Sequence, residues 1–137
     1  MGAKFFPAEV IARPGGEILK VTSAKNEDFI EAKEVYCSTL EPLAVRAWKL
    51  HTEMTVNAFV PVGEVTFVIA NEDSFDTYTL GPKANWGRLS IEPGTWFGFQ
   101  GGPDGGVVLN LADIAHDPDE SQTKDVEEFE FEFNKPS

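Results

Sequence analysis

Short runs of hydrophobic residues alternate with polar residues along most of this chain, and glycine or proline interrupts them every few positions. A period of two is typical of a β-strand with one buried face, while glycine and proline mark the turns between strands. The runs are also rich in Val, Ile, Phe and Thr, which strands favour. The pattern predicts strands at residues 18–22, 34–38, 45–51, 55–60, 64–70, 77–80, 87–91, 96–99 and 107–112.

Two connections between these strands contain glycines that can adopt a positive φ. Residues 61–64 and 103–106 therefore both predict hairpin joints. Many short strands joined in this way indicate an all-β protein, either a barrel or a sandwich. No change of composition marks a boundary, so we expect one domain over residues 1–137.

The C-terminal stretch, residues 121–137, is acidic and aromatic. Within it Phe129, Phe131 and Phe133 alternate with Glu130 and Glu132, which predicts a strand with one apolar and one acidic face. Exposing three phenylalanine rings to water is unfavourable, so we expect this strand to pack on the barrel or on a second subunit.

Charge and cysteine usage narrow the classes of partner. The chain has 11 basic and 23 acidic residues, a formal net charge of −12, which repels nucleic acid and anionic membrane surfaces. Its single cysteine, Cys37, cannot form an internal disulfide. No apolar run is long enough for a signal peptide core or a membrane span. We therefore expect a cytoplasmic protein.

One predicted strand carries the most informative pair of residues. Strict alternation places Lys49 and His51 on one face, and Arg46, Trp48 and Leu50 on the other. If the first face points inward, a desolvated lysine is a candidate base or a clamp for an anionic ligand. If it points outward, the lysine is solvated and the histidine merely hydrogen-bonded. The alternation alone leaves both readings open.

Other side chains are candidates for ligand contact. Asn57 and Asn110 lie on predicted strands, where a buried amide contacts a ligand or fills an internal hydrogen-bond network. Trp48 and Trp96 either stack on a sugar or base or belong to the core. Arg88 precedes the turn between the predicted strands at 87–91 and 96–99 and is a further candidate for binding substrate.

His116 and Asp117 are adjacent, just before Pro118. They predict either a dyad in which the carboxylate orients the imidazole or, as we favour, a simple polar turn. In the first case His116 would be a candidate substrate contact.

Two segments together resemble a known family. Arg46-Ala47-Trp48-Lys49-Leu50-His51 and the segment from Ile91-Glu92-Pro93-Gly94 to Phe99 are similar to the paired motifs of a cupin barrel, most of all those of the dTDP-4-dehydrorhamnose 3,5-epimerase family. The resemblance runs over about residues 15–120. It implies an antiparallel double-stranded β-helix, the cupin jelly roll, and a homodimer.

The chain departs from that family at the positions that carry its chemistry. Lys49 stands where the epimerases have their base histidine, Phe97 stands where they have a second histidine, and no tyrosine lies near residues 114–115, where they have their acid. Arg46 matches the family's arginine, which in the epimerases contacts the nucleotide sugar, so the resemblance implies the same contact here. Of the positions that ligate metal in other cupins only His51 matches, so we expect neither a metal nor another cofactor.

The resemblance and the residues together favour an enzyme, a metal-independent epimerase or isomerase of a 4-keto dTDP-sugar in the biosynthesis of cell-surface carbohydrate. Lys49 and His51 are then the candidate catalytic residues. Arg46, Trp48, Asn57, Arg88, Trp96, Asn110 and His116 are the candidate contacts to the sugar nucleotide. The alternative is a cupin that binds a sugar or nucleotide sugar without catalysing a reaction.

Overall fold

The computed structural model describes residues 2–136 and confirms the all-β prediction. The elements are β1 (Ala3–Pro7), β2 (Glu9–Arg13), β3 (Gly16–Lys20), β4 (Glu34–Leu40), β5 (Val45–His51), β6 (Val56–Ala70), β7 (Phe75–Leu80), β8 (Gly87–Ile91), β9 (Trp96–Ala112), β10 (Ser121–Thr123) and the 3-10 turn η1 (Val126–Glu128).

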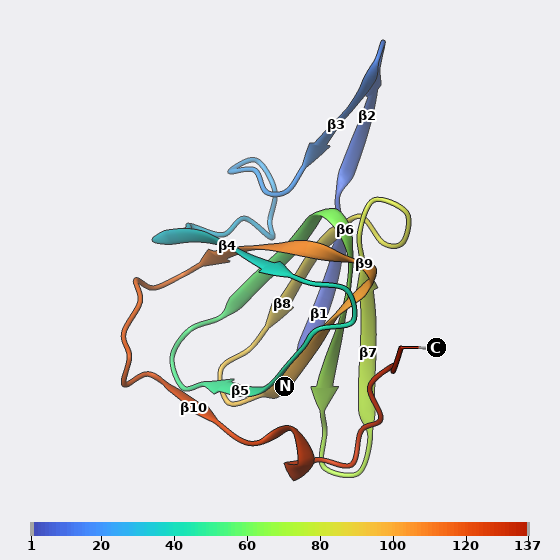
Figure 1. The fold of residues 1–137 in the computed structure, drawn as a ribbon. Coiled ribbons are helices and arrows are strands. Elements are labelled where there is room, and N and C mark those ends of the chain that lie inside the picture. The colour runs from blue at the N-terminus through green and yellow to red at the C-terminus, as the bar shows by residue number, and fades with distance from the viewer. Residues whose placement is uncertain (1, 137) are drawn as a thin grey trace.

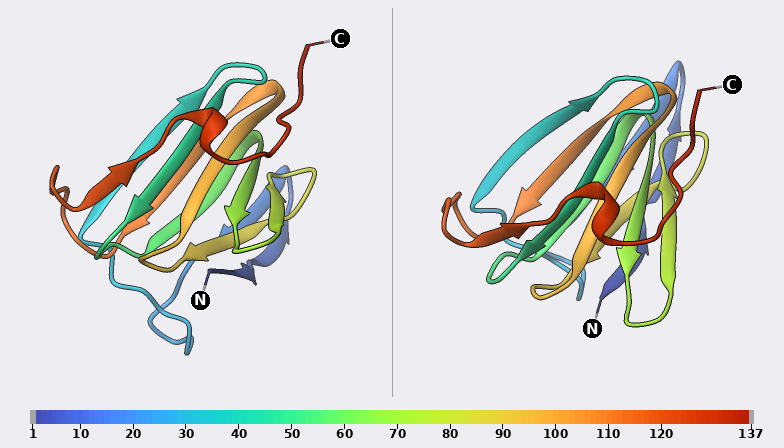
Figure 2. Two further views of the ribbon diagram at one scale, coloured as in Figure 1. Left: turned by 90° about the horizontal axis from the view of Figure 1, so that it is seen from below. Right: turned by 60° about the horizontal axis from the view of Figure 1, so that its bottom comes forward.

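One antiparallel sheet folds over on itself to enclose the core (Figures 1 and 2). Its order is β1-β8-β6-β9-β5-β10, with β4 added on β9 and β7 added on β6. The long strands β6 and β9 pair with each other along both of their halves. In its first half β9 pairs with β5, and in its second half with β4, so these three strands surround the same space.

The two predicted hairpin joints are wrong, because both segments lie inside the long strands. Gly63 in β6 has a φ of 76° and Gly105 in β9 has a φ of 77°, so each lets its strand bend without ending. The bends face each other, and a Cβ on Gly63 would lie 2.3 Å from the carbonyl oxygen of Gly105. Because these glycines have no side chain, the two continuous strands can approach each other closely at the bends.

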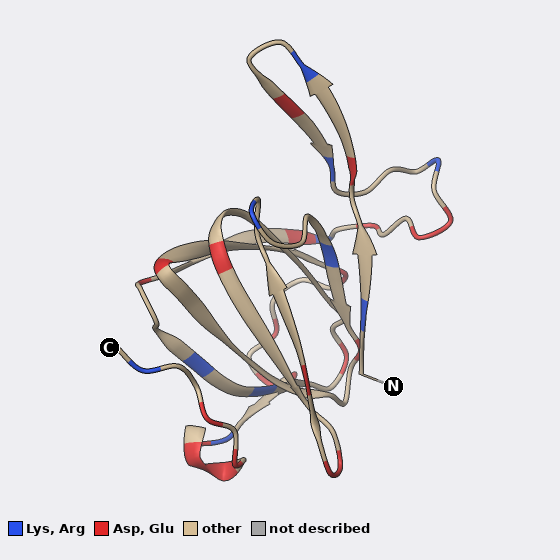
Figure 3. Ribbon diagram, turned by 90° about the vertical axis from the view of Figure 1, so that its right-hand side faces the viewer, with Lys and Arg blue, Asp and Glu red and all other residues tan. Residues whose placement is uncertain are grey.

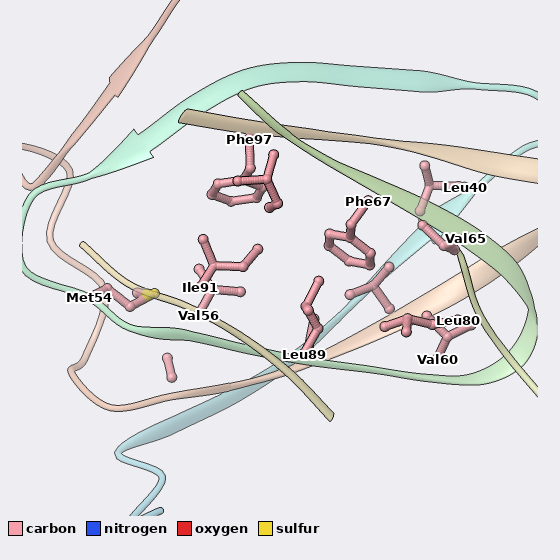
Figure 4. Close-up of a cluster of buried hydrophobic side chains, with 14 residues drawn as sticks. Leu40, Met54, Val56, Val60, Val65, Phe67, Leu80, Leu89, Ile91 and Phe97 are labelled. Carbon is pink, nitrogen blue, oxygen red and sulfur yellow. The ribbon is translucent and has the colours of Figure 1, made fainter. Parts of the chain in front are cut away.

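The core fills the folded sheet. Figure 4 shows it running from Met54 and Phe97 at one end to Val65 and Leu80 at the other. Phe67, which is 1% exposed, lies between these ends and stacks on Phe99 with ring centroids 5.2 Å apart. The apolar end formed by Phe97 also borders a cavity between β4, β5, β6 and β9.

The C-terminal stretch packs on the barrel, but the strand predicted there is wrong. Residues 129–133 form no strand, and the acidic turn η1 precedes them (Figure 3). Their rings contact aromatic side chains instead of a neighbouring backbone: Phe129 lies 5.0 Å from Trp48, and Phe131 lies 5.2 Å from Phe75. Side-chain packing replaces the expected ladder of hydrogen bonds.

The hairpin of β2 and β3 forms a separate two-stranded sheet that stands away from the barrel (Figures 1 and 3). Its side chains Val10 and Ile18 are 44% and 47% exposed. Within residues 2–136 no helix has the length and apolar character needed to cross a membrane.

Candidate functional site

A cavity of about 360 Å³ opens between β4, β5, β6 and β9, with Thr123 of β10 at its side. Its inner wall is apolar, formed by side chains that include Val56, Ala58, Phe67 and Phe97. Polar and charged side chains from β4, β5 and β9 complete the lining. An apolar pocket with a few convergent polar groups is the usual form of a small-molecule site.

Strand β5 supplies the densest set of polar groups, because its alternation is broken. The register against β9 shifts between Ala47 and Lys49, so residues on both sides of the shift line the cavity. The prediction that Lys49 and His51 face away from Arg46 and Trp48 is therefore wrong: all four side chains border the same space.

The structure separates the two members of the predicted catalytic pair by their burial. His51 is 8% exposed and stacks on Phe97 with ring centroids 6.1 Å apart. Lys49 is exposed, as is Arg46, whose Nη2 donates to the carbonyl oxygen of Thr39. The lysine is thus solvated while bordering the cavity, a combination that neither of the two sequence readings described.

A buried carboxylate fixes the imidazole of His51. Oε1 of Glu120 lies 2.8 Å from Nδ1 of His51, and Oε2 accepts hydrogen bonds from the backbone N–H groups of Glu53 and Met54, each at 3.0 Å. Glu120 is only 4% exposed. Glu120 was not among the site residues expected from the sequence.

The surroundings of Glu120 favour its ionised form. Burial alone would raise the pKa of this carboxyl group, but the hydrogen bonds from Met54, His51 and Glu53 outweigh it, so that the pKa lies below its ordinary value of 4.5. A carboxylate at Oε1 accepts a proton-bearing Nδ1, which leaves Nε2 as the second functional nitrogen of the ring. This is the arrangement of an oriented general base.

Five of the predicted site residues lie together at this cavity: Arg46, Trp48, Lys49, His51 and Asn110. Trp48 nevertheless belongs to the core. It is 1% exposed, its ring lies among phenylalanines, and its Nε1 donates to the carbonyl oxygen of Val126 at 2.9 Å. A side chain held in this way has no free face on which a base could stack.

Asn57 and Arg88 lie at a different place from the one expected. Both line a second cavity, of about 420 Å³, beside β1 and β8. Nη1 of Arg88 donates to Oδ1 of Asn57 at 2.9 Å, and its Nη2 donates to the carbonyl oxygen of Asp28 at 2.7 Å. Neither residue lines the first cavity, and internal hydrogen bonds hold both side chains, although Nε of Arg88 has no partner among residues 2–136.

Trp96 and His116 border neither cavity. The Trp96 ring is covered by Lys124, whose Nζ lies 4.6 Å from the ring centroid. His116 is exposed after the end of β9, and its backbone N–H donates to Glu34. The contact between this imidazole and Asp117 that a dyad requires is absent among the hydrogen bonds of residues 2–136, in line with the polar turn.

Tyr36 is a residue of the cavity that was likewise not expected from the sequence. It lines the cavity from β4, directly opposite Asn110 on β9, and its hydroxyl oxygen accepts a hydrogen bond from Nδ2 of Asn110 at 2.9 Å. A tyrosine in a strand has no sequence signal that separates it from an ordinary packing residue.

Across residues 2–136, no three His, Cys, Asp or Glu side chains are grouped to hold a metal ion.

Solved structures of similar fold identify the family. A dTDP-sugar isomerase from Desulfovibrio desulfuricans G20 is 32% identical, with a TM-score of 0.81 over 90% of this chain and 83% of that chain. A sugar 3,4-ketoisomerase from Thermoanaerobacterium thermosaccharolyticum, in complex with TDP, is 20% identical, with a TM-score of 0.73 over 88% and 86%. A 3'-monoepimerase from Streptomyces bikiniensis, in complex with dTDP-quinovose, is 11% identical, with a TM-score of 0.78 over 89% and 69%.

No protein-family model and no curated protein sequence matches the chain. The structural matches confirm the predicted cupin jelly roll and its resemblance to the epimerases of dTDP-sugars. The first of them is close enough in sequence, and covers enough of both chains, to establish membership and not only a shared fold. This chain belongs to the dTDP-sugar isomerase family of cupins.

Proposed function

We propose that this protein catalyses proton transfer at a carbon next to the ketone of a 4-keto dTDP-sugar, with His51 as the general base. The observation that carries the proposal is the buried pair of His51 and Glu120 at an apolar cavity. Abstraction of a proton next to a ketone needs an oriented base in a site that excludes water. The Glu120 carboxylate supplies the orientation, and Phe97 supplies an apolar neighbour.

The substrate class follows from the relatives. The isomerase that is 32% identical is named for a dTDP sugar, and two of the more distant structures hold TDP or dTDP-quinovose. A nucleotide sugar carries a diphosphate, which arginine and lysine recognise. Arg46 and Lys49 are exposed cations beside the cavity, so we assign them to the diphosphate and not to the proton transfer. The product would enter the biosynthesis of cell-surface carbohydrate.

The experiment is deuterium incorporation from heavy water. With TDP-4-keto-6-deoxyglucose as substrate, the protein should exchange a proton next to the ketone, and His51→Gln should lower the rate by about 10²-fold or more while dTDP still binds. His116→Gln is the matched control, because the chain has only two histidines and this one is exposed. If the unaltered protein binds dTDP but exchanges no carbon-bound proton, the enzyme proposal fails and the non-catalytic binding cupin replaces it.

We also propose a cytoplasmic homodimer built from this single domain. Cys37 is exposed and unpaired, which favours a reducing compartment. An isolated two-stranded hairpin is marginally stable in water, and the β2–β3 hairpin exposes Val10 and Ile18, so a second copy of the chain is a suitable cover. The aromatic C-terminal stretch is a poorer candidate, because its rings pack on their own barrel.

Sedimentation velocity tests the dimer. The unaltered protein should sediment as a dimer, and Ile18→Asp should shift it to a monomer without unfolding the barrel. Val126→Asp, at another exposed apolar side chain outside the hairpin, is the control that should remain dimeric. A monomer at micromolar concentration of the unaltered protein would contradict the proposal.

A further inference from the structure

The proposed base accounts for the proton on carbon but not for the protons on oxygen. When a ketone moves between adjacent carbons, each oxygen also gains or loses a proton. Of the hydroxyl groups at the first cavity, those of Tyr36, Ser38 and Thr123, the phenol of Tyr36 is the strongest acid by its chemistry. Whether this phenol can donate a proton to a substrate depends on the direction of its O–H bond.

The hydrogen bonds of Asn110 determine the direction of the Tyr36 O–H bond. Its Oδ1 accepts the backbone N–H of Asn57 at 3.0 Å. A backbone N–H only donates, so the amide of Asn110 cannot reverse without losing this bond. Its Nδ2 is therefore held against the hydroxyl oxygen of Tyr36, at 2.9 Å, and against Sδ of Met54, at 3.7 Å.

The amide nitrogen also only donates, so Tyr36 must accept at this contact. Its own hydrogen is turned away from Asn110, and none of the hydrogen bonds within residues 2–136 uses it. Tyr36 is 39% exposed, whereas Asn110 is 4% exposed. The phenol thus presents its hydrogen at the cavity, with a buried amide behind it.

The network behind Asn110 is rigid. Asn57 is 1% exposed, and its Nδ2 donates to the carbonyl oxygen of Leu111 at 3.2 Å. Its Oδ1 accepts from Nη1 of Arg88 at 2.9 Å. A continuous series of buried hydrogen bonds therefore runs from Arg88 at the second cavity to Tyr36 at the first, and it fixes the direction of each donor along the way.

We propose that Tyr36 exchanges protons with the oxygens of the sugar during a 3,4-ketoisomerisation, the reaction for which two of the structural relatives are named, and that Asn110 is the residue positioning its hydroxyl. The inference rests on the proposed function, because it needs His51 as the base.

The two groups complete the reaction without a further acid. His51 takes the proton from C3 as Tyr36 gives its proton to the C4 oxygen, which leaves an enediol, a tyrosinate and an imidazolium. His51 then gives the proton to C4 as the hydroxyl on C3 gives its proton to the tyrosinate. The ketone has moved from C4 to C3, and both side chains have returned to their starting forms.

The first test removes the phenolic oxygen alone. Tyr36→Phe should lower kcat by about 10²-fold and change KM much less, because the proton is transferred only in the transition state. Tyr78→Phe is the matched control: the chain has two tyrosines, and Tyr78 packs against the core from β7. If Tyr36→Phe raises KM and leaves kcat unchanged, Tyr36 is a binding contact and the proposal is overturned.

The second test reverses the hydrogen bond at Asn110. In Asn110→Asp one carboxylate oxygen still accepts from Asn57, but the other now accepts the hydrogen of Tyr36 and withdraws it from the substrate. The kcat should fall by about 10²-fold at neutral pH, and its ratio to the unaltered protein should rise as the pH is lowered and the aspartate protonates. A purely structural role would give a ratio that does not depend on pH, which would count against the positioning role.

The double variant Tyr36→Phe/Asn110→Asp completes the set. If Asn110 acts through Tyr36, the double variant should be no slower than Tyr36→Phe, whereas independent effects would multiply and contradict the inference. Failure of the proposed function is recognised separately, since the unaltered protein would then exchange no proton at all. If the unaltered protein converts substrate and Tyr36→Phe does so equally fast, only the inference about Tyr36 fails.

Discussion

Nδ1 of His51 lies 2.8 Å from Oε1 of Glu120, although the two residues are 69 positions apart in the chain. Strand β10, immediately after Glu120, makes this contact by pairing with β5, where Ser121 is the partner of His51. The other carboxylate oxygen is held by two backbone N–H groups, so Glu120 has no freedom to turn away. The direction of the imidazole is therefore set by the pairing of β10 with β5 along the side of the cavity.

Glu120→Gln tests this orientation. The amide keeps the shape, but it removes the charge that stabilises a protonated imidazole and offers fewer lone pairs to the N–H groups of Glu53 and Met54. We expect kcat to fall by about 10²-fold, within the range of general acid–base effects, with a small change in KM. Steady-state kinetics measure both. Asp119→Asn, at the exposed neighbouring position, is the control, and equal kcat values for the two variants would contradict the role of Glu120.

The lowered pKa of Glu120 also predicts how stability depends on pH. A carboxyl group whose pKa is lower in the folded state stabilises the fold fully above its unfolded value of 4.5, and this contribution is lost as the pH falls through the folded value. The free energy of unfolding should therefore decrease below about pH 4.5, and less steeply in Glu120→Gln. Urea denaturation at a series of pH values measures this, and parallel curves for the two proteins would refute it.

The predicted strands depart from the structure where a glycine of positive φ can serve either a turn or a bend within a strand. The predicted ends of β5 and β8 agree with the structure, because their hydrophobic runs stop at polar turns. The segments around Gly63 and Gly105 contain the same residues as hairpin joints, yet they are bends within β6 and β9. A positive φ is needed in both cases, and only the pairing of distant strands distinguishes them.

The candidate site was predicted only in part, for a related reason. Arg46, Lys49 and His51 were found because basic residues in a hydrophobic strand are unusual. Glu120 lies in a polar segment, and nothing in that segment indicates that its side chain is buried. Its burial depends on the pairing of β10 with β5, a contact between distant parts of the chain that no local pattern encodes.

Lys49→Met separates binding from catalysis at the cavity. If the lysine holds the diphosphate, KM for the nucleotide sugar should rise about 10-fold or more, because one charge-assisted hydrogen bond is worth roughly 1.5–3 kcal/mol. The exchange rate at saturating substrate should be retained. Lys83→Met, at an exposed position outside the cavities, should change neither value. Loss of exchange at saturation would instead assign Lys49 to the proton transfer.

Arg88→Met tests the assignment of Arg88 to the fold. This residue is 2% exposed, and burial lowers the pKa of its guanidinium even though Asp28 opposes the shift. Its removal takes one hydrogen bond from Oδ1 of Asn57 and the ion pair from Asp28, so we expect the free energy of unfolding to fall by about 3 kcal/mol. The Kd for dTDP should stay within about twofold, as measured by calorimetry. A weaker Kd with unchanged stability would restore Arg88 to the binding site.

Phe129→Ala tests how the C-terminal stretch is held. The ring contacts Trp48 edge-on at 5.0 Å and lies 5.2 Å from Nζ of Lys124. Because this ring is half-buried, its loss should cost about 2 kcal/mol of stability, less than the usual cost for a fully buried phenylalanine. Phe29→Ala is the control at a ring that is 47% exposed. Equal denaturation midpoints for both variants would show that the stretch is not anchored there.

Glu120 follows the long strands of the sheet in the chain, and this has a consequence for the order of events during synthesis. The strands that form most of the cavity wall, β4, β5, β6 and β9, all leave the ribosome before the carboxylate does. A nascent chain can therefore enclose its core while the imidazole of His51 still lacks the partner that orients it. Catalytic competence would then appear as a separate and later event, when β10 docks along β5.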